Sequence, residues 1–117
     1  MAARYELKHS KNAEFIFNLL AGNNQVIFTS QVYKEKSGAL NGIKSVQKNA
    51  GVDARYERKV AKDDESYFVL LAANKEVIGR SQLYKSKESL EKGIASVKKN
   101  GPVAPIKDLT HTAPKAK

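Results

Sequence analysis

The stretch GIKSVQKN at Gly42–Asn49 returns 51 residues later as GIASVKKN at Gly93–Asn100. The correspondence extends in both directions without a gap, so that residues 5–50 align with residues 56–101, and 23 of the 46 aligned positions are identical. Positions that both copies keep are positions that both copies need. Most of them are apolar or form turns, so the repeat says more about architecture than about activity.

The length favours one domain, since 117 residues are few for two,. A single copy is near the size at which a lone hydrophobic core becomes marginal, so we expect the two copies to share one core. No apolar run is long enough to span a bilayer, and the first five residues lack the apolar stretch of a signal peptide,. The chain has no cysteine, which excludes disulfides,. We therefore expect a soluble cytoplasmic protein that does not bind membranes.

Alternating apolar residues predict three strands in each copy. In the first copy these are residues 5–9, 14–21 and 26–31, with counterparts at 56–60, 65–72 and 77–82. In the second strand Phe17, Leu19 and Ala21 are identical in both copies, so we assign them to the core face,. Ile16, Asn18 and Leu20 then point to the other face. The apolar residues of that face either form a contiguous patch, interrupted by Asn18 in the first copy only, or remain scattered; they are Ile16, Leu20, Tyr67, Val69 and Leu71. Asn-containing turns, which tolerate positive φ, follow this strand in each copy.

After the strands the apolar period changes to three and four, which predicts one helix per copy,. Ser37 and Ser86 are candidate N-caps, and the helices are expected to stop at Asn49 and Asn100 near glycines,. The stripe contains a mid-helix glycine in both copies, although glycine disfavours helices. We expect close packing there. The stripes consist of Ala39, Gly42, Ile43, Val46 and Ala50, and of Leu90, Gly93, Ile94, Val97 and Gly101.

Together these elements predict an α+β fold of two tandem β-β-β-α repeats. An antiparallel sheet carries two helices on one face, and the copies are related by an approximate twofold axis. We expect residues 1–101 to form this single domain, with repeats at 5–50 and 56–101. Residues 102–117 contain Pro102 and Pro105, which cannot continue the helix, and are expected to form a disordered tail,.

The motifs shared by the copies resemble those of the YegP-like family, small bacterial proteins of unknown function built from tandem domains of roughly 50 residues. The similarity rests on an aromatic-x-Leu-x-Ala strand, an Asn turn followed by Val-Ile, a Ser-Gln-x-Tyr segment and the helix ending Gly-Ile-x-Ser-Val-x-Lys-Asn. It covers both copies and implies the β-β-β-α repeat. In single-repeat members two chains can pair, so the resemblance implies a monomer with an internal pseudo-dimer. It implies no activity, ligand or catalytic residue.

The net charge of +9 is spread along the chain, because each copy contributes +3. A spread excess attracts polyanions weakly and is poorer evidence for a nucleic-acid site than a basic stripe. Phe15, a possible stacking group, becomes Ser66 in the second copy. Weak nucleic-acid association therefore stays an alternative, and it predicts affinity that falls steeply with salt.

The most polar positions that the copies share lie where the third strand leads into the helix. Lysine beside a helix N-terminus could hold an anion there. The competing interpretation is that Ser and Gln satisfy loop backbone groups while Tyr closes the edge of the core. These candidate ligand or partner residues are Ser30, Gln31, Tyr33 and Lys34, with Ser81, Gln82, Tyr84 and Lys85.

Catalytic patterns are weak in this sequence. His9 becomes Val60 in the second copy, and no His or Cys pair has metal-ligand spacing,. There is no glycine-rich phosphate loop and no Ser/His/Asp set. We therefore expect no metal, no cofactor and no enzyme. The leading hypothesis is a non-enzymatic binding or interaction module that acts through the open sheet face or the strand–helix junctions.

Overall fold

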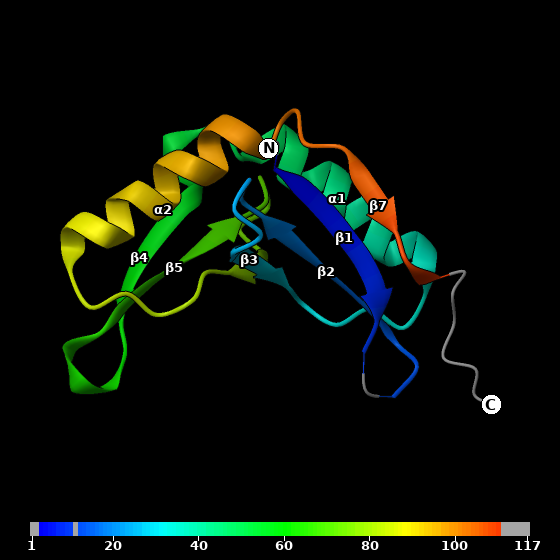
Figure 1. The fold of residues 1–117 in the computed structure, drawn as a ribbon, viewed down its shortest axis with the longest axis horizontal. Coiled ribbons are helices and arrows are strands. Elements are labelled where there is room, and N and C mark those ends of the chain that lie inside the picture. The colour runs from blue at the N-terminus through cyan, green and yellow to red at the C-terminus, as the bar shows by residue number, and fades with distance from the viewer. Residues whose placement is uncertain (1–2, 11, 111–117) are drawn as a thin grey trace.

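The computed structural model describes residues 3–10 and 12–110, which form one sheet and two long helices (Figure 1). Three strands and a helix follow each other twice, and one further strand closes the chain. The elements are β1 Arg4–His9, β2 Phe15–Leu20, β3 Val26–Ser30, α1 Lys36–Asn49, η1 Asp53–Arg55, β4 Tyr56–Val60, η2 Lys62–Asp64, β5 Ser66–Leu71, β6 Val77–Arg80, α2 Lys87–Asn100 and β7 Ile106–Asp108.

The seven strands form a single sheet in the order β4-β5-β6-β3-β2-β1-β7. The sheet bends into an arch, and both helices lie on its outer side (Figure 1). The expected α+β class is therefore confirmed. The sheet is not wholly antiparallel, because β7 runs parallel to β1. Among the described residues no helix combines the length and apolar character needed to cross a bilayer.

The alternation in β2 and β5 places their side chains as the sequence predicts. Phe17, Leu19, Phe68 and Leu70 have no exposed surface and form the centre of the core. The hairpins that follow are closed by the shared asparagine, because the Asn23 side chain accepts a hydrogen bond from the Gln25 amide at 3.0 Å. Asn74 and Glu76 form the same contact in the second copy. The positive φ falls one residue later, on Asn24 and on Lys75.

The helices end at Asn49 and Asn100 as expected, but their caps differ from the prediction. Ser86 caps α2 by accepting from the Ser89 amide at 3.0 Å, whereas α1 begins one residue before Ser37, with Glu35 at the cap position. No glycine among the described residues has positive φ, so Gly101 ends α2 in a right-handed conformation. Glycine is needed there because a Cβ would meet the Val97 carbonyl oxygen and the Ala50 side chain.

The first tyrosine of each copy is bonded to the helix of the other copy. The Tyr5 hydroxyl donates to the Gly101 carbonyl, and the Tyr56 hydroxyl donates to the Ala50 carbonyl, both at 2.6 Å and both buried. These carbonyls belong to helix ends, which leave backbone acceptors without intrahelical partners. Each copy therefore satisfies the other copy's helix end.

The halves of the sheet join through β3 and β6, where Thr29 lies opposite Arg80 and Ser30 opposite Gly79. Phe28 fills the core beside this joint and has no exposed surface. Its counterpart 51 residues on is Gly79, where a Cβ would meet the Phe28 ring and the Thr29 carbonyl. One phenylalanine thus occupies a space that two could not share.

The extension after residue 101 is partly ordered, which corrects the expected tail. Ala104 is buried, β7 pairs with β1, and a Lys36–Asp108 ion pair of 2.6 Å ties the strand to the start of α1. Hydrogen bonds from Lys36 and from Thr110 lower the pKa of the Asp108 carboxyl. The opposite sheet edge, β4, has three exposed charged residues instead of a covering strand, which discourages pairing with other chains,. Residues 111–117 lie outside the described residues.

The buried tyrosines make stability depend on alkaline pH. Burial raises the pKa of Tyr5 and of Tyr56 above the ordinary value of 10.0. The unfolded chain therefore ionises first, so the stabilisation is complete below about pH 10 and is lost as the pH rises further. We expect the free energy of unfolding to fall by roughly 3 kcal/mol between pH 9 and pH 11 from these two groups, as measured by urea unfolding at each pH.

The Tyr5→Phe variant is the control for this effect. It should lose about 1 kcal/mol at pH 7, because the Gly101 carbonyl loses its donor,. It should also show a shallower decline above pH 10 than the parent protein. An unchanged decline would mean that other groups cause the alkaline loss.

Candidate binding site

The hydroxyls of Ser30 and Ser81, two of the predicted ligand residues, are hydrogen-bonded to backbone groups within the fold. Each is buried and accepts a hydrogen bond from the amide of a β2 or β5 phenylalanine, Phe17 or Phe68, at 2.9 and 3.0 Å. Each hydroxyl also donates to the carbonyl of the following glutamine. These serines therefore satisfy backbone groups and present no free group to a ligand.

Tyr33 and Tyr84 explain the mid-helix glycines. The ring of Tyr33 stacks on Phe17 at 6.2 Å between centroids, and a Cβ at Gly42 would clash with the Tyr33 hydroxyl. Tyr84 and Gly93 meet in the same way. Burial raises the pKa of both tyrosines, and a hydrogen bond from Gln82 opposes the shift at Tyr84. The glycines and tyrosines therefore form one packing unit.

The remaining predicted residues are exposed, and Gln31 and Gln82 each line one of the two hollows described below. The Gln31 amide lies 3.5 Å from the Val77 carbonyl. Lys34 and Lys85 are exposed and line none of the hollows described below. The start of α1 carries the Lys36–Asp108 pair, and the start of α2 is capped by Ser86. Lys34 and Lys85 are thus not brought together with the serines and glutamines that line the hollows.

A different set of residues meets on the sheet face that the helices leave uncovered, here called the open face. One row of paired positions crosses six strands of this face around the Thr29–Arg80 pair. Its order, from β4 to β1, is Glu57, Val69, Arg80, Thr29, Asn18 and Glu6. The row places Arg80 at the middle, with Glu57 and Glu6 toward its ends, and it continues to Lys107 of β7 beside Glu6. Both carboxylates are ion-paired, Glu57 with Lys59 and Glu6 with Arg4.

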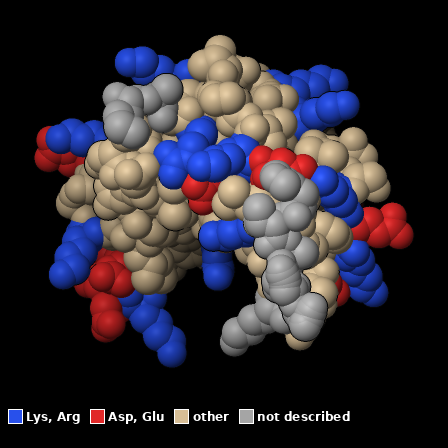
Figure 2. All heavy atoms as spheres, turned by 45° about the vertical axis from the view of Figure 1, so that its right-hand side comes forward, with Lys and Arg blue, Asp and Glu red and all other residues tan. Residues whose placement is uncertain are grey.

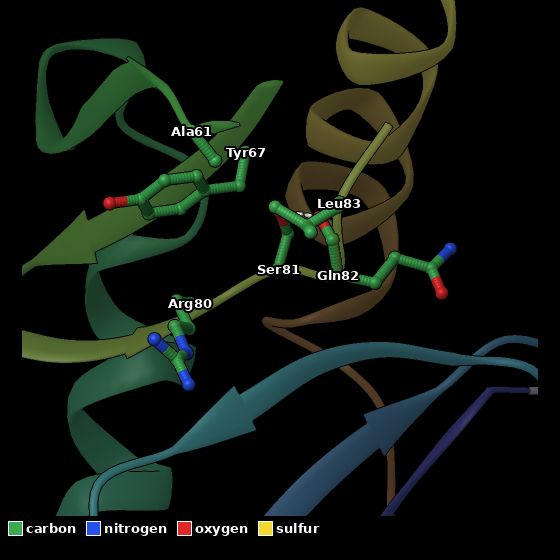
Figure 3. A pocket seen from close by; sticks show the side chains of 6 residues that line it. All are labelled: Ala61, Tyr67, Arg80, Ser81, Gln82 and Leu83. Carbon is green, nitrogen blue, oxygen red and sulfur yellow. Dashed lines mark hydrogen bonds between the residues drawn. The ribbon is translucent and has the colours of Figure 1, made fainter. Parts of the chain in front are cut away.

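Two hollows lie on the open face, one on each side of Arg80. The first, here called the Tyr67 hollow, has a volume of about 410 Å³. Figure 3 shows Tyr67 and Ala61 on one side of it, Leu83 and Ser81 on another, and Arg80 below the tyrosine ring, whereas the Gln82 side chain extends away. The second, here called the Ile16 hollow, has about 350 Å³ and is lined by Ile16, Thr29, Val32 and Arg80 among others.

Arg80 is the one arginine whose side chain has no hydrogen bond or ion pair within residues 3–10 and 12–110. The others are each bonded: Arg4 to Glu6, Arg55 to Asn49 and Arg58 to Glu91. Thr29, opposite Arg80, has its hydroxyl bonded to the Asn18 amide at 2.9 Å. A free guanidinium is a planar donor that binds carboxylates in a bidentate way.

The open face exposes less apolar surface than the contiguous patch considered from the sequence would, because some of its apolar residues are buried. Leu20 and Val69 are buried to about 95%, at 6% and 5% exposure, and do not contribute to a patch. Ile16 and Tyr67 are half-buried, and Val32 and Leu83 are each 52% exposed at the mouths of the hollows. The apolar surface that remains therefore belongs to the two hollows.

The side chains of the open face offer hydrogen-bond donors and apolar contact. No group of three or more His, Cys, Asp or Glu side chains that could hold a metal ion occurs among the described residues. Arg80 supplies charge and hydrogen-bond donors, while Tyr67 and Leu83 supply apolar contact. This combination suits a ligand with an anionic group next to an apolar one.

Comparison with known proteins shows that the chain belongs to the family described as Domain of unknown function (DUF1508), which matches it twice, at residues 10–57 and 61–108. It is 56% identical over 110 residues to a UPF0339 protein of Acinetobacter baylyi, covering 94% of this chain and 99% of that protein. A UPF0339 protein of Pasteurella multocida is 54% identical, with 93% and 96% covered. No function is established for the family.

Two solved structures share the fold. The solution NMR structure of UPF0339 protein SO3888 from Shewanella oneidensis has a TM-score of 0.88 and 52% identity, over 93% of this chain and 92% of that one. The solution NMR structure of YegP from Escherichia coli, a protein of unknown function, has a TM-score of 0.87 and 46% identity, over 93% and 94%. The YegP-like resemblance is thus confirmed.

The two family matches have the same 51-residue shift as the repeat. Each begins just after β1 or β4, and they end in β4 and in β7. The alignment of the two copies does not single out Arg80, because the corresponding residue is Thr29. The signal that the sequence does contain is a basic residue at the end of the otherwise apolar strand β6.

The packing of tyrosine on glycine predicts that replacing a mid-helix glycine by alanine destabilises the protein, although alanine is the better helix former,. Gly42→Ala adds a better helix former, worth about 1 kcal/mol, but its Cβ would enter the space of Tyr33 and Phe17. We expect a net loss of about 1–3 kcal/mol, seen as a lower midpoint of thermal unfolding. Gly42→Leu should be worse.

Gly51→Ala is the matched control, because no atom lies within 4 Å of a Cβ at that position. It should leave the melting temperature nearly unchanged. If Gly42→Ala stabilised the protein instead, the tyrosine contact would not be what requires glycine.

Proposed function

We propose that this protein is a non-enzymatic interaction module of the bacterial cytoplasm, whose open face binds an acidic segment of a partner protein. The observation that carries the proposal is the unpaired guanidinium of Arg80 between two hollows at the middle of the sheet. A partner carboxylate would supply the acceptors that Arg80 lacks among the described residues.

We further infer that the two copies are related by an approximate twofold axis, which runs close to Arg80. Thr29 and Arg80 are 51 residues apart and directly paired, and on the helix side the ends of α1 and α2 meet at Ala50 and Gly101. A position on such an axis can differ between the copies without disturbing the rest of the packing. Arg80 is therefore well placed to carry a specific function.

The charge pattern favours an acidic protein segment over a nucleic acid. A strand of phosphates that crossed the sheet along the Arg80 row would meet Glu57, ion-paired with Lys59, on one side of Arg80. On the other side it would meet Glu6, ion-paired with Arg4, before Lys107 at the edge. Lysines and arginines are spread over the surface with acidic residues among them, as Figure 2 shows for one side. One central cation flanked by carboxylates selects a locally anionic group rather than a long polyanion.

The proposal is tested by retention of proteins from a bacterial lysate on the immobilised full chain. We compare the parent protein with Arg80→Gln and with Lys85→Gln, which removes the same charge outside the hollows. We expect a protein that is retained by the parent and by Lys85→Gln, is lost with Arg80→Gln, and is eluted by poly-L-glutamate but unaffected by nuclease.

Two results would contradict this function. Retention that disappears after nuclease treatment and falls equally in both variants would favour spread polyanion binding. Retention that is the same with Arg80→Gln as with the parent would remove the open face from the interaction. Arg80 is exposed, so both variants should keep the parent's urea unfolding curve, which confirms that folding is intact,.

A further inference from the structure

We infer that the two hollows beside Arg80 are not equivalent, and that the Tyr67 hollow selects a partner residue with a flat apolar side chain next to the bound carboxylate. The inference rests on the proposed function and adds its specificity. It assigns Arg80 to the carboxylate, and Tyr67 and Leu83 to the neighbouring side chain.

The first step is that the repeat supplies a built-in comparison of the hollows. Tyr67 in β5 corresponds to Ile16 in β2, and Leu83 corresponds to Val32. Each hollow is therefore bordered by one side chain from a β2-type strand and one from the segment after a β3-type strand. The two walls have the same architecture but different chemistry.

The second step is that the aromatic wall suits planar groups. A tyrosine ring offers a face for stacking, whereas the branched side chains of Ile16 and Val32 do not. Tyr67 is half-buried, so its ring is held while part of it stays accessible. Leu83 adds a flexible apolar contact at 52% exposure.

The third step is that Arg80 is the one cationic residue that lines either hollow, and it lines both. Lys8 and Lys59 lie farther out, opposite Ile16 and Tyr67 in the neighbouring strands. The residue of the first copy that corresponds to Arg80 is Thr29, whose hydroxyl accepts a hydrogen bond from the Asn18 amide. Arg80 and Tyr67 line the same hollow, and in the view of Figure 3 the guanidinium is drawn lower than the tyrosine ring. A dipeptide unit with a carboxylate and an adjacent aromatic ring can reach both groups, since the side chains come from neighbouring, paired strands,.

Defined peptides test the inference by NMR of the ¹⁵N-labelled full chain. Ac-Phe-Glu-NH2 is compared with Ac-Phe-Gln-NH2, which lacks the charge, and with Ac-Ala-Glu-NH2, which lacks the ring. For probes this small we expect millimolar affinity. Saturable shifts should centre on the amides of Tyr67, Arg80 and Leu83, and each control peptide should bind at least about fivefold more weakly.

The chain provides the matched variants. Tyr67→Ile installs the residue of the first copy and should reduce Ac-Phe-Glu-NH2 to the affinity of Ac-Ala-Glu-NH2, without changing the latter. Ile16→Ala should change neither affinity by more than about twofold. Arg80→Gln should weaken both acidic peptides about tenfold, which is the loss of a charge-assisted hydrogen-bonded contact.

Several outcomes would overturn the inference. These are shifts centred on the Ile16 hollow, equal binding of the three peptides, or no saturable binding of any peptide at 10 mM. Tighter binding of single-stranded octathymidylate than of Ac-Phe-Glu-NH2 at physiological salt would also overturn it, in favour of nucleic acid. If the peptides fail while a lysate protein still depends on Arg80, the proposed function survives and this specificity does not.

Discussion

The fold depends on two buried tyrosine hydroxyls that cross between the copies. Tyr5 bonds the end of α2, and Tyr56 bonds the end of α1. A buried helix end needs partners for its last carbonyls, and an unpaired buried acceptor costs about 1–3 kcal/mol. Because each copy supplies the donor that the other needs, neither is complete alone. The exchange also brings the C-terminal ends of both helices together at Ala50 and Gly101.

With the helix ends fixed, the sheet halves must join at β3 and β6, and the joint decides what each face can carry. On the covered face, one space is filled by Phe28 because Gly79 leaves it free. On the open face, Arg80 lies opposite Thr29. In each pair, Phe28 with Gly79 and Thr29 with Arg80, the two residues occupy corresponding positions of the copies but differ in type. At the β3–β6 joint the two copies therefore carry different residues, and this difference places Arg80 in the candidate site.

The sequence predicts the parts of this architecture that depend on periodicity. The apolar alternation of β2 places Phe17 and Leu19 correctly, and the three-and-four spacing places Gly42 and Ile43 on the buried side of α1. The strand β7 has no such pattern, being three residues long directly after Pro105. Its position follows from tertiary contacts, namely pairing with β1 and the Lys36–Asp108 bond.

The candidate site was less predictable than the fold, for a related reason. Ser30 and Ser81 are shared because their hydroxyls complete the bonding of β2 and β5 backbone amides. Tyr33 and Tyr84 are shared because each fills the space left by a helix glycine. These four shared polar residues therefore have structural contacts, while Arg80 occurs in one copy only. Register information, which the sequence lacks, is what brings Arg80 next to Tyr67 and opposite Thr29.

A tandem chain can carry a residue at this joint that two identical chains could not. In a symmetric pair of single copies, any residue at the position of Arg80 would face itself across the β3–β6 ladder. Two arginines directly opposite each other would repel, because paired side chains lie about 5 Å apart. Here Thr29 takes the opposing place, and its hydroxyl is turned to Asn18. One guanidinium therefore remains at the middle of the sheet without a like charge against it. The duplication in one chain makes possible both the filled core at Phe28 and the single cation at the β3–β6 joint.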